Sequence, residues 1–245
     1  MWYPVTALPV MWIQLKDVIE IRFQNGFLYW DKTGEIATKL SAMLPALALG
    51  SASPGQTDLV DQENQISIRY SYMVLNLSQD LDPLPDVKLS ESANAIFKLV
   101  VSLIGVSTLT RIGHRMQFVQ KFKSEAEANE FRDAIAGKNR LGIESFATNE
   151  EPWIASKKLT NISATYGDEK TGMTIALSTG KVGFSVGGPI LKMLAGPVPK
   201  LSDIVMIDVD VFTSQATLVD KVDISIFQQS NLSLFKRKIE PIFSL

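Results

Sequence analysis

Apolar and polar residues alternate along several stretches of the chain, which predicts β-strands because successive strand side chains point to opposite faces. The first stretch covers residues 13 to 23. It ends at Asn25-Gly26, a pair typical of hairpin turns, so we expect a second short strand at residues 27 to 30. The principal strands are predicted at residues 65 to 77, 106 to 122 and 204 to 212.

The stretch from 106 to 122 is long enough for one bent strand or two consecutive strands, with Gly113 marking a bulge. One of its faces is mainly apolar and the other is polar and basic. The first face carries Ile112, His114, Met116, Phe118 and Phe122, and the second carries Arg111, Arg115, Gln117 and Lys121. In the stretch from 204 to 212, the valines and Ile207 are expected to be buried while Asp208 and Asp210 face away.

Apolar residues at helical spacing predict four helices in other parts of the chain. A short helix begins near residue 37, is limited by Pro45, and is followed by an exposed loop at residues 50 to 55. A core helix begins with Ser90 as its cap and ends at Gly105, where a left-handed residue is favoured.

The other two helices follow the long strands. Ser124 and Glu127 form a capping box for a helix that ends at Gly137. A terminal helix begins between residues 220 and 225 and carries basic residues near its end, which suits the helix dipole.

We therefore predict an α+β fold with two halves, each a mainly antiparallel sheet covered by helices. The halves cover residues 1–137 and 153–245, and residues 138–152 form the linker. In the second half we expect a strand pair at 159–166 and 173–177, another strand at 181–186, and a short apolar turn or helix at 187–194. Both halves run through strands to a prominent strand and a helix, which suggests a degenerate duplication.

Composition narrows the function classes. Apolar residues make up 46% of the 245 residues and charged residues 20%, as in ordinary globular proteins. Lysine plus arginine number 24 against 26 acidic residues, so overall charge gives no reason to expect nucleic-acid binding. The chain has no cysteine, which removes disulfides and thiolate metal sites. No apolar stretch is long enough to cross a bilayer and no signal peptide is recognisable, so we expect a cytoplasmic location.

Two segments carry a resemblance to a known family: Arg111-Ile-Gly-His-Arg-Met116 and Ile207-Asp-Val-Asp-Val211. The pattern resembles a sporadically distributed, functionally uncharacterised bacterial family, in which an Arg-Val-Gly-Leu-Arg-Tyr strand precedes a later Asp-Ile-Asp strand. His114 stands where that pattern usually has an aliphatic residue, and Met116 where it favours an aromatic one. The resemblance implies an intracellular bacterial protein and carries no established active site.

Candidate catalytic and metal residues are few. His114 is the only histidine, and its apolar strand face favours a hydrogen-bonded core or interface position over a catalytic one. Asp208 and Asp210 share a strand face, and a divalent cation there would need Asp203 or Asp220 as a further ligand. A solvated outer face explains the pair more simply. No phosphate-binding loop or dinucleotide motif is present, so we expect no cofactor.

A set of arginines on neighbouring strands provides a candidate binding surface: Arg22, Arg69, Arg111 and Arg115. Guanidinium groups match phosphate and carboxylate geometry, so such a sheet face could hold an anion or a nucleotide. Glu20 and Asp17 could equally neutralise the arginines as cross-strand pairs.

Exposed hydrophobic residues provide the other candidate surface. Aromatic residues gather near the starts of both halves, and the chain ends in an apolar segment; they dock within the molecule or form a subunit interface. These residues are Trp2, Tyr3, Trp12, Tyr29, Trp30, Trp153 and the segment 242–245.

The leading hypothesis is a non-catalytic interaction or assembly protein that binds itself or another protein subunit. The second hypothesis is a sensor of an anionic metabolite or nucleotide, and the third is a metal-dependent hydrolase using Asp208, Asp210 and His114.

Overall fold

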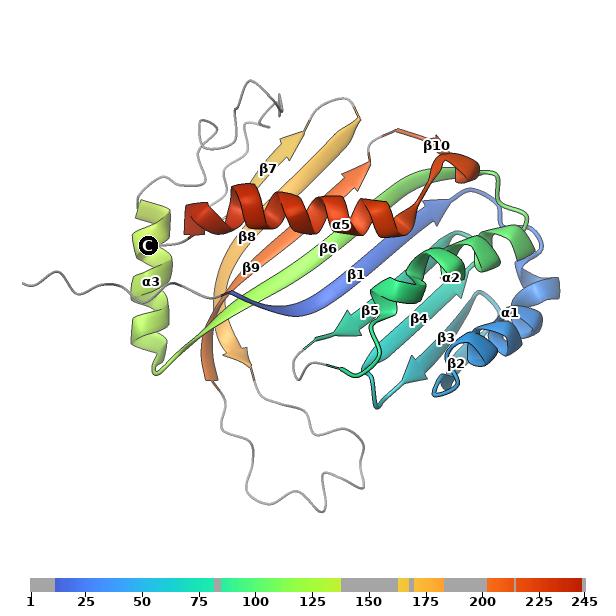
Figure 1. Cartoon of the computed structure of the whole chain (residues 1–245), viewed down its shortest axis with the longest axis horizontal. Coiled ribbons are helices and arrows are strands. Elements are labelled where there is room, and N and C mark those ends of the chain that lie inside the picture. The colour runs from blue at the N-terminus through green and yellow to red at the C-terminus, as the bar shows by residue number, and fades with distance from the viewer. Residues whose placement is uncertain are drawn as a thin grey trace, which may run out of the picture.

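The structure is a computed structural model that describes residues 12–81, 85–137, 163–167, 170–182, 202–213 and 215–243. Strands from both predicted halves join one antiparallel sheet, with helices packed against it (Figure 1). The α+β class with an antiparallel sheet is therefore confirmed. Among the described helices, none is long and apolar enough to span a membrane.

In the part of the chain that the structure describes, the sheet has nine strands along its main path, and every neighbouring pair is antiparallel. In sheet order they are β2 (Ala48–Ser53), β3 (Gln56–Asp61), β4 (Ile66–Ser71), β5 (Val74–Asp80), β1 (Ile13–Phe23), β6 (Thr108–Phe122), β9 (Ser202–Thr213), β8 (Thr171–Val182) and β7 (Ser163–Gly167). A short strand, β10 (Thr217–Leu218), pairs with the beginning of β6.

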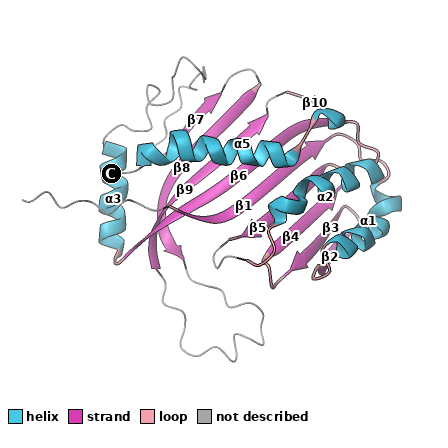
Figure 2. Ribbon diagram, viewed as in Figure 1, coloured by secondary structure: helices cyan, strands magenta, loops and turns pink. Residues whose placement is uncertain are grey.

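The helices lie on one side of this sheet, as Figures 1 and 2 show for α1, α2 and α5. Within the described residues the α-helices are α1 (Tyr29–Met43), α2 (Leu89–Leu103), α3 (Glu125–Gly137) and α5 (Ile224–Leu234). A 3-10 turn, η2 (Val219–Lys221), precedes α5, which continues as the π-helical η3 (Phe235–Ile239) and the 3-10 turn η4 (Glu240–Phe243).

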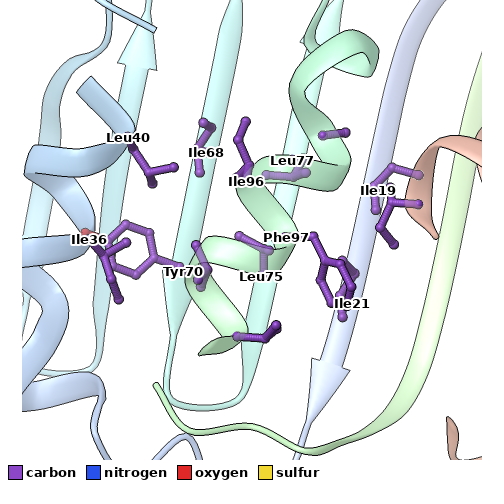
Figure 3. Packing of buried hydrophobic residues seen from close by; sticks show 14 of the residues in the cluster. Ile19, Ile21, Ile36, Leu40, Ile68, Tyr70, Leu75, Leu77, Ile96 and Phe97 are labelled. Carbon is purple, nitrogen blue, oxygen red and sulfur yellow. The ribbon is translucent and has the colours of Figure 1, made fainter. Parts of the chain in front are cut away.

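The first core cluster lies between α1, α2 and the β4–β5–β1 part of the sheet. Alternate strand residues point into it, and each of those labelled in Figure 3 is at most 1% exposed. They are Ile19, Ile21, Ile68, Tyr70, Leu75 and Leu77 from the strands, with Ile36, Leu40, Ile96 and Phe97 from the helices. Full burial of such a side chain stabilises the fold by about 1.5–3 kcal/mol, so this cluster holds the helix layer to the sheet.

The second cluster lies between β6, β9 and β8 and the helical elements α3, α5 and η3. The rings of Phe118 and Phe235 stack with centroids 3.5 Å apart. Trp12 and Phe243 are buried in this cluster and meet edge to face, so the apolar residues at both ends of the described chain dock intramolecularly. Tyr29 is also buried, Trp30 is exposed, and Trp2, Tyr3 and Trp153 lie outside the described residues.

Two predictions for residues 24 to 61 are wrong. Residues 27 to 30 turn into α1 instead of completing a hairpin, because Tyr29, the first residue of α1, is buried and its hydroxyl hydrogen-bonds Thr57. The strands beside β1 come from later in the chain. Residues 50 to 55, predicted as an exposed loop, belong to the β2–β3 hairpin instead.

The principal strands are found where they were predicted, with two differences in detail. The stretch 65–77 is a hairpin of β4 and β5 that turns at Tyr72-Met73. Residues 108 to 122 form one strand, and its register with β1 shifts near Leu15 and beyond Arg22, not at Gly113.

The described residues also bear on the two predicted halves. The linker 138–152 and the segment 187–194 lie outside them, as does most of the expected strand 181–186. The sheet is continuous across the pairing of β1 with β6, so the two halves do not form separate sheets. The same order of elements occurs twice along the chain: a strand, a helix, several strands and a second helix. It runs first from β1 to α2 and then from β6 to α5. The duplication itself stays a hypothesis.

Candidate functional site

The sheet face that the helices leave uncovered is polar. Period-two alternation produces it: on β1, Ile19 and Ile21 point to the helices, so Glu20 and Arg22 point to the open face. The same alternation places Arg69 of β4 and Arg111 and Arg115 of β6 on this face, where their carboxylate partners also lie. The structure thus brings the predicted arginines to one sheet face.

A hollow of about 470 Å³ lies on this open face where β5, β1, β6 and β9 run side by side. Four cationic and two carboxylate side chains line it, and two of the cations pair with carboxylates just outside the lining: Lys16 with Asp80, and Arg115 with Asp208. The lining residues are Lys16, Val18, Glu20, Arg22, Asn76, Arg111, Gly113, Arg115, Gln117 and Asp210. Arg69 does not line the hollow.

Arg111 is fixed in place by contacts to three strands. Its Nη1 donates to Glu20 on β1 at 2.7 Å and its Nη2 donates to Asp210 on β9 at 2.8 Å. Its guanidinium carbon lies 4.9 Å from the centre of the Phe212 ring, a cation–π distance. The side chain lies over Gly113, where a Cβ would come within 2.7 Å of Nη1. Gly113 therefore allows the guanidinium to lie against the strand backbone.

Arg115 and Arg22 are held less completely. Arg115 binds Asp208 with Nε and Nη2, and this hydrogen bonding raises the pKa of Arg115 above its usual value. Arg22 uses only Nε, which donates to Glu20 at 2.8 Å. Within the described residues, Nη1 of Arg115 and both terminal nitrogens of Arg22 have no hydrogen-bond partner. These donors remain open to a ligand.

Arg69 forms a separate pair with Asp58 on the neighbouring strand β3, at 2.7 Å. Burial opposes ionisation of Asp58, but hydrogen bonds from Arg69 and Ser51 outweigh it and lower the pKa of Asp58. Arg69 is therefore neutralised locally and does not contribute to the hollow.

Asp208 and Asp210 face away from the core, as predicted, and each holds an arginine: Asp208 binds Arg115, and Asp210 binds Arg111. Among the described residues, no group of three or more histidine, aspartate or glutamate side chains could hold a metal ion. Asp203 and Asp220, the other candidate ligands, complete no such group within that part of the chain.

His114 lies in the core beneath the helix layer, 2% exposed. Its Nε2 is 2.6 Å from Oδ1 of Asp17, and Gln228 of α5 donates to Asp17 Oδ2 at 3.3 Å. The predicted core position of His114 is confirmed. Asp17 therefore lies on the helix side of β1 and cannot neutralise the arginines, as we had considered, whereas Glu20 does so.

Sequence reasoning missed Lys16 and Asn76 of the hollow, and it placed Gln117 on the basic strand face without including it in the candidate site. Their alternation places them on the same face, but the neighbour relations among β5, β1, β6 and β9 were needed to bring them together. No protein-family model matches the chain, and a search of curated proteins finds no match. The resemblance to a sporadically distributed bacterial family stays a prediction.

Proposed function

We propose that the protein is a non-catalytic binding protein that holds a small polyanion in the open-face hollow. The observation that carries this proposal is the set of cations around one fixed guanidinium: both terminal nitrogens of Arg111 are paired, while Arg22 and Arg115 keep open donors beside it. Phosphate and carboxylate groups accept such forked hydrogen bonds in two places at once.

The size of the hollow supports a metabolite and not a single ion. Its volume of about 470 Å³ lies within the range of small-molecule sites, about 300–1,000 Å³. Its lining is polar, and Val18 is its only large apolar side chain. A nucleotide base would need an aromatic or apolar wall to stack against, so a polyphosphate or a polycarboxylate fits this chemistry better than a base-recognised nucleotide.

The carboxylates of the site have a structural role in this proposal. Glu20 and Asp210 hold Arg111 from opposite sides, so the guanidinium is already in place before a ligand arrives. Preorganised side chains lose less conformational freedom on binding, which favours affinity. Glu20 and Asp210 would also repel an anion that reached too far toward Arg111, and Lys16 is paired with Asp80 at 3.0 Å, so the ligand engages Arg22 and Arg115.

Isothermal titration calorimetry with pyrophosphate, inorganic phosphate and citrate tests this proposal. We expect at least one polyanion to bind, and Arg22→Gln to weaken binding about 10- to 100-fold, as loss of a charged hydrogen bond of about 1.5–3 kcal/mol requires. A thermal-shift assay gives a second readout, since a ligand at about 100 times its dissociation constant stabilises the fold by about 2.7 kcal/mol.

Two arginine variants serve as controls. Arg69→Gln changes an open-face arginine outside the hollow, and Arg237→Gln changes an exposed arginine of η3. Both should bind the anion like the unmodified protein. The proposal is wrong if none of the three anions binds, or if all three variants weaken binding equally, which would indicate diffuse attraction by surface charge.

A further inference from the structure

The strand β2 forms one edge of the sheet. Among the described strands it pairs with β3 only, and all six of its residues are exposed. Figure 1 shows it at the opposite end of the sheet from β7, beside α1. An edge strand presents a row of backbone donors and acceptors that another strand can pair with.

This edge lacks the usual protection by charge. From Leu40 to Thr57 the chain contains no ionisable side chain over 18 residues, although charged residues make up 20% of the whole. Natural proteins commonly place lysine or other charges on exposed edge strands to prevent pairing. Pro45 and Pro54 flank β2 and lie outside it, so the strand itself carries neither charge nor proline.

The helix layer ends at the same edge with exposed apolar side chains. Leu49 of β2 pairs in register with the buried Leu59, so it belongs to the helix side of the sheet, yet it is 63% exposed. Met43, the last residue of α1, is also among the exposed large hydrophobic residues. At β2, therefore, both the backbone edge of the sheet and the apolar side chains of the helix layer are exposed.

We propose that β2 pairs with β2 of a second copy of this chain, antiparallel and across a two-fold axis. Such an interface is isologous, so each strand must be complementary to itself. A small, uncharged strand satisfies this condition because no like charges meet across the axis. A charged peptide would find no complementary side chain on β2, so the second copy is the better-matched occupant.

The proposed dimer has two consequences. The two-fold axis is perpendicular to the continuous sheet of the dimer. Both helix layers therefore lie on one face of this sheet, and both hollows lie on the opposite face. The interface consists of one strand pair and a few apolar side chains, which is smaller than a standard interface of about 1,600 Å². The dimer therefore dissociates on dilution.

Size-exclusion chromatography with light scattering over a wide concentration range tests the proposal. We expect dimers at high concentration and monomers on dilution. Leu49→Lys should abolish the dimer because it removes an apolar contact and places two positive charges in a small, uncharged interface. Ile226→Lys is the matched control, since Ile226 of α5 is equally exposed, and it should leave the dimer intact.

A single-cysteine scan of residues 48 to 53 locates the contact, because the chain has no cysteine of its own. Under mild oxidation, cysteines on β2 should give disulfide-linked dimers most readily near the axis, and Ile226→Cys should not. A strict monomer at all concentrations overturns the proposal. So does an open polymer, or a dimer that Leu49→Lys leaves intact and no β2 cysteine cross-links.

Discussion

Gly172 and Phe212 are paired in register on β8 and β9, and the phenyl ring lies against the glycine. A Cβ at residue 172 would come within 2.4 Å of two ring carbons. The same ring supports the guanidinium of Arg111 from below. A glycine on one strand thus leaves room for an aromatic ring on the next, and that ring contacts Arg111 of the hollow.

Gly172→Ala should therefore destabilise the fold by about 1–3 kcal/mol, as overpacking usually does. Gly180→Ala on the same strand is the control. A Cβ at residue 180 meets nothing within 4 Å, and the substitution removes the conformational freedom of a glycine. Urea denaturation measures both. In a Phe212→Ala background the cost of Gly172→Ala should shrink. Equal effects of the two alanine substitutions would contradict the role of the ring.

At the scale of elements, the helices differ in how they begin. α3 begins with the predicted capping box: Ser124 accepts from the backbone of Glu127, whose side chain accepts from the Lys123 amide. α5 is capped by Asp223, whose side chain accepts from the Ile226 amide at 3.0 Å. The predicted cap of α2 at Ser90 is wrong, because the Leu89 amide donates to the buried side chain of Gln79.

These differences explain which parts of the fold could be predicted. Ser124 and Glu127 are neighbours in sequence, so their motif is visible there, whereas Gln79 reaches α2 only after β5 has been placed in the sheet. β9 and the open-face arginines were predicted because each alternates against buried residues. β2 was missed because its small residues are all exposed and carry no alternation. The pairing of Arg111 with Asp210 needed the strand order, which the sequence pattern does not contain.

Asp223→Ala should destabilise the protein by about 1–2 kcal/mol because it removes a helix cap. Asp223 also accepts from Asn94 of α2, so the substitution weakens the contact between the two helices. Ser90→Ala should change stability by less than about 0.5 kcal/mol, because its side chain caps nothing. Chemical denaturation compares the two variants. A larger loss from Ser90→Ala would show that the α2 start depends on its own hydroxyl.

At the scale of the whole molecule, two core clusters share one sheet. The first lies mainly over β1, β4 and β5, and the second over β6, β8 and β9. β1 and β6 pair over most of their length between them. The buried contacts of Asp17 with His114 and Gln228 cross the same boundary. We therefore expect the two clusters to unfold as one cooperative unit.

Phe97→Ala in the first cluster tests this cooperativity. It should destabilise the fold by about 3–5 kcal/mol and lower hydrogen-exchange protection of β8 and β9, which belong to the second cluster. Phe27→Ala is the control, since Phe27 is 72% exposed. Unchanged protection of β8 and β9 in Phe97→Ala would instead support two independently folding halves.

The pairing of β1 with β6 also affects how the chain folds while it is being synthesised. β1 emerges from the ribosome among the first described residues, and β5 can cover one of its edges once residue 80 has been added. Its other edge waits for β6, which is complete only at Phe122. During that interval Ile19, Ile21 and Phe23 lie on a strand with an open edge, so nascent chains of this protein should be especially dependent on chaperones.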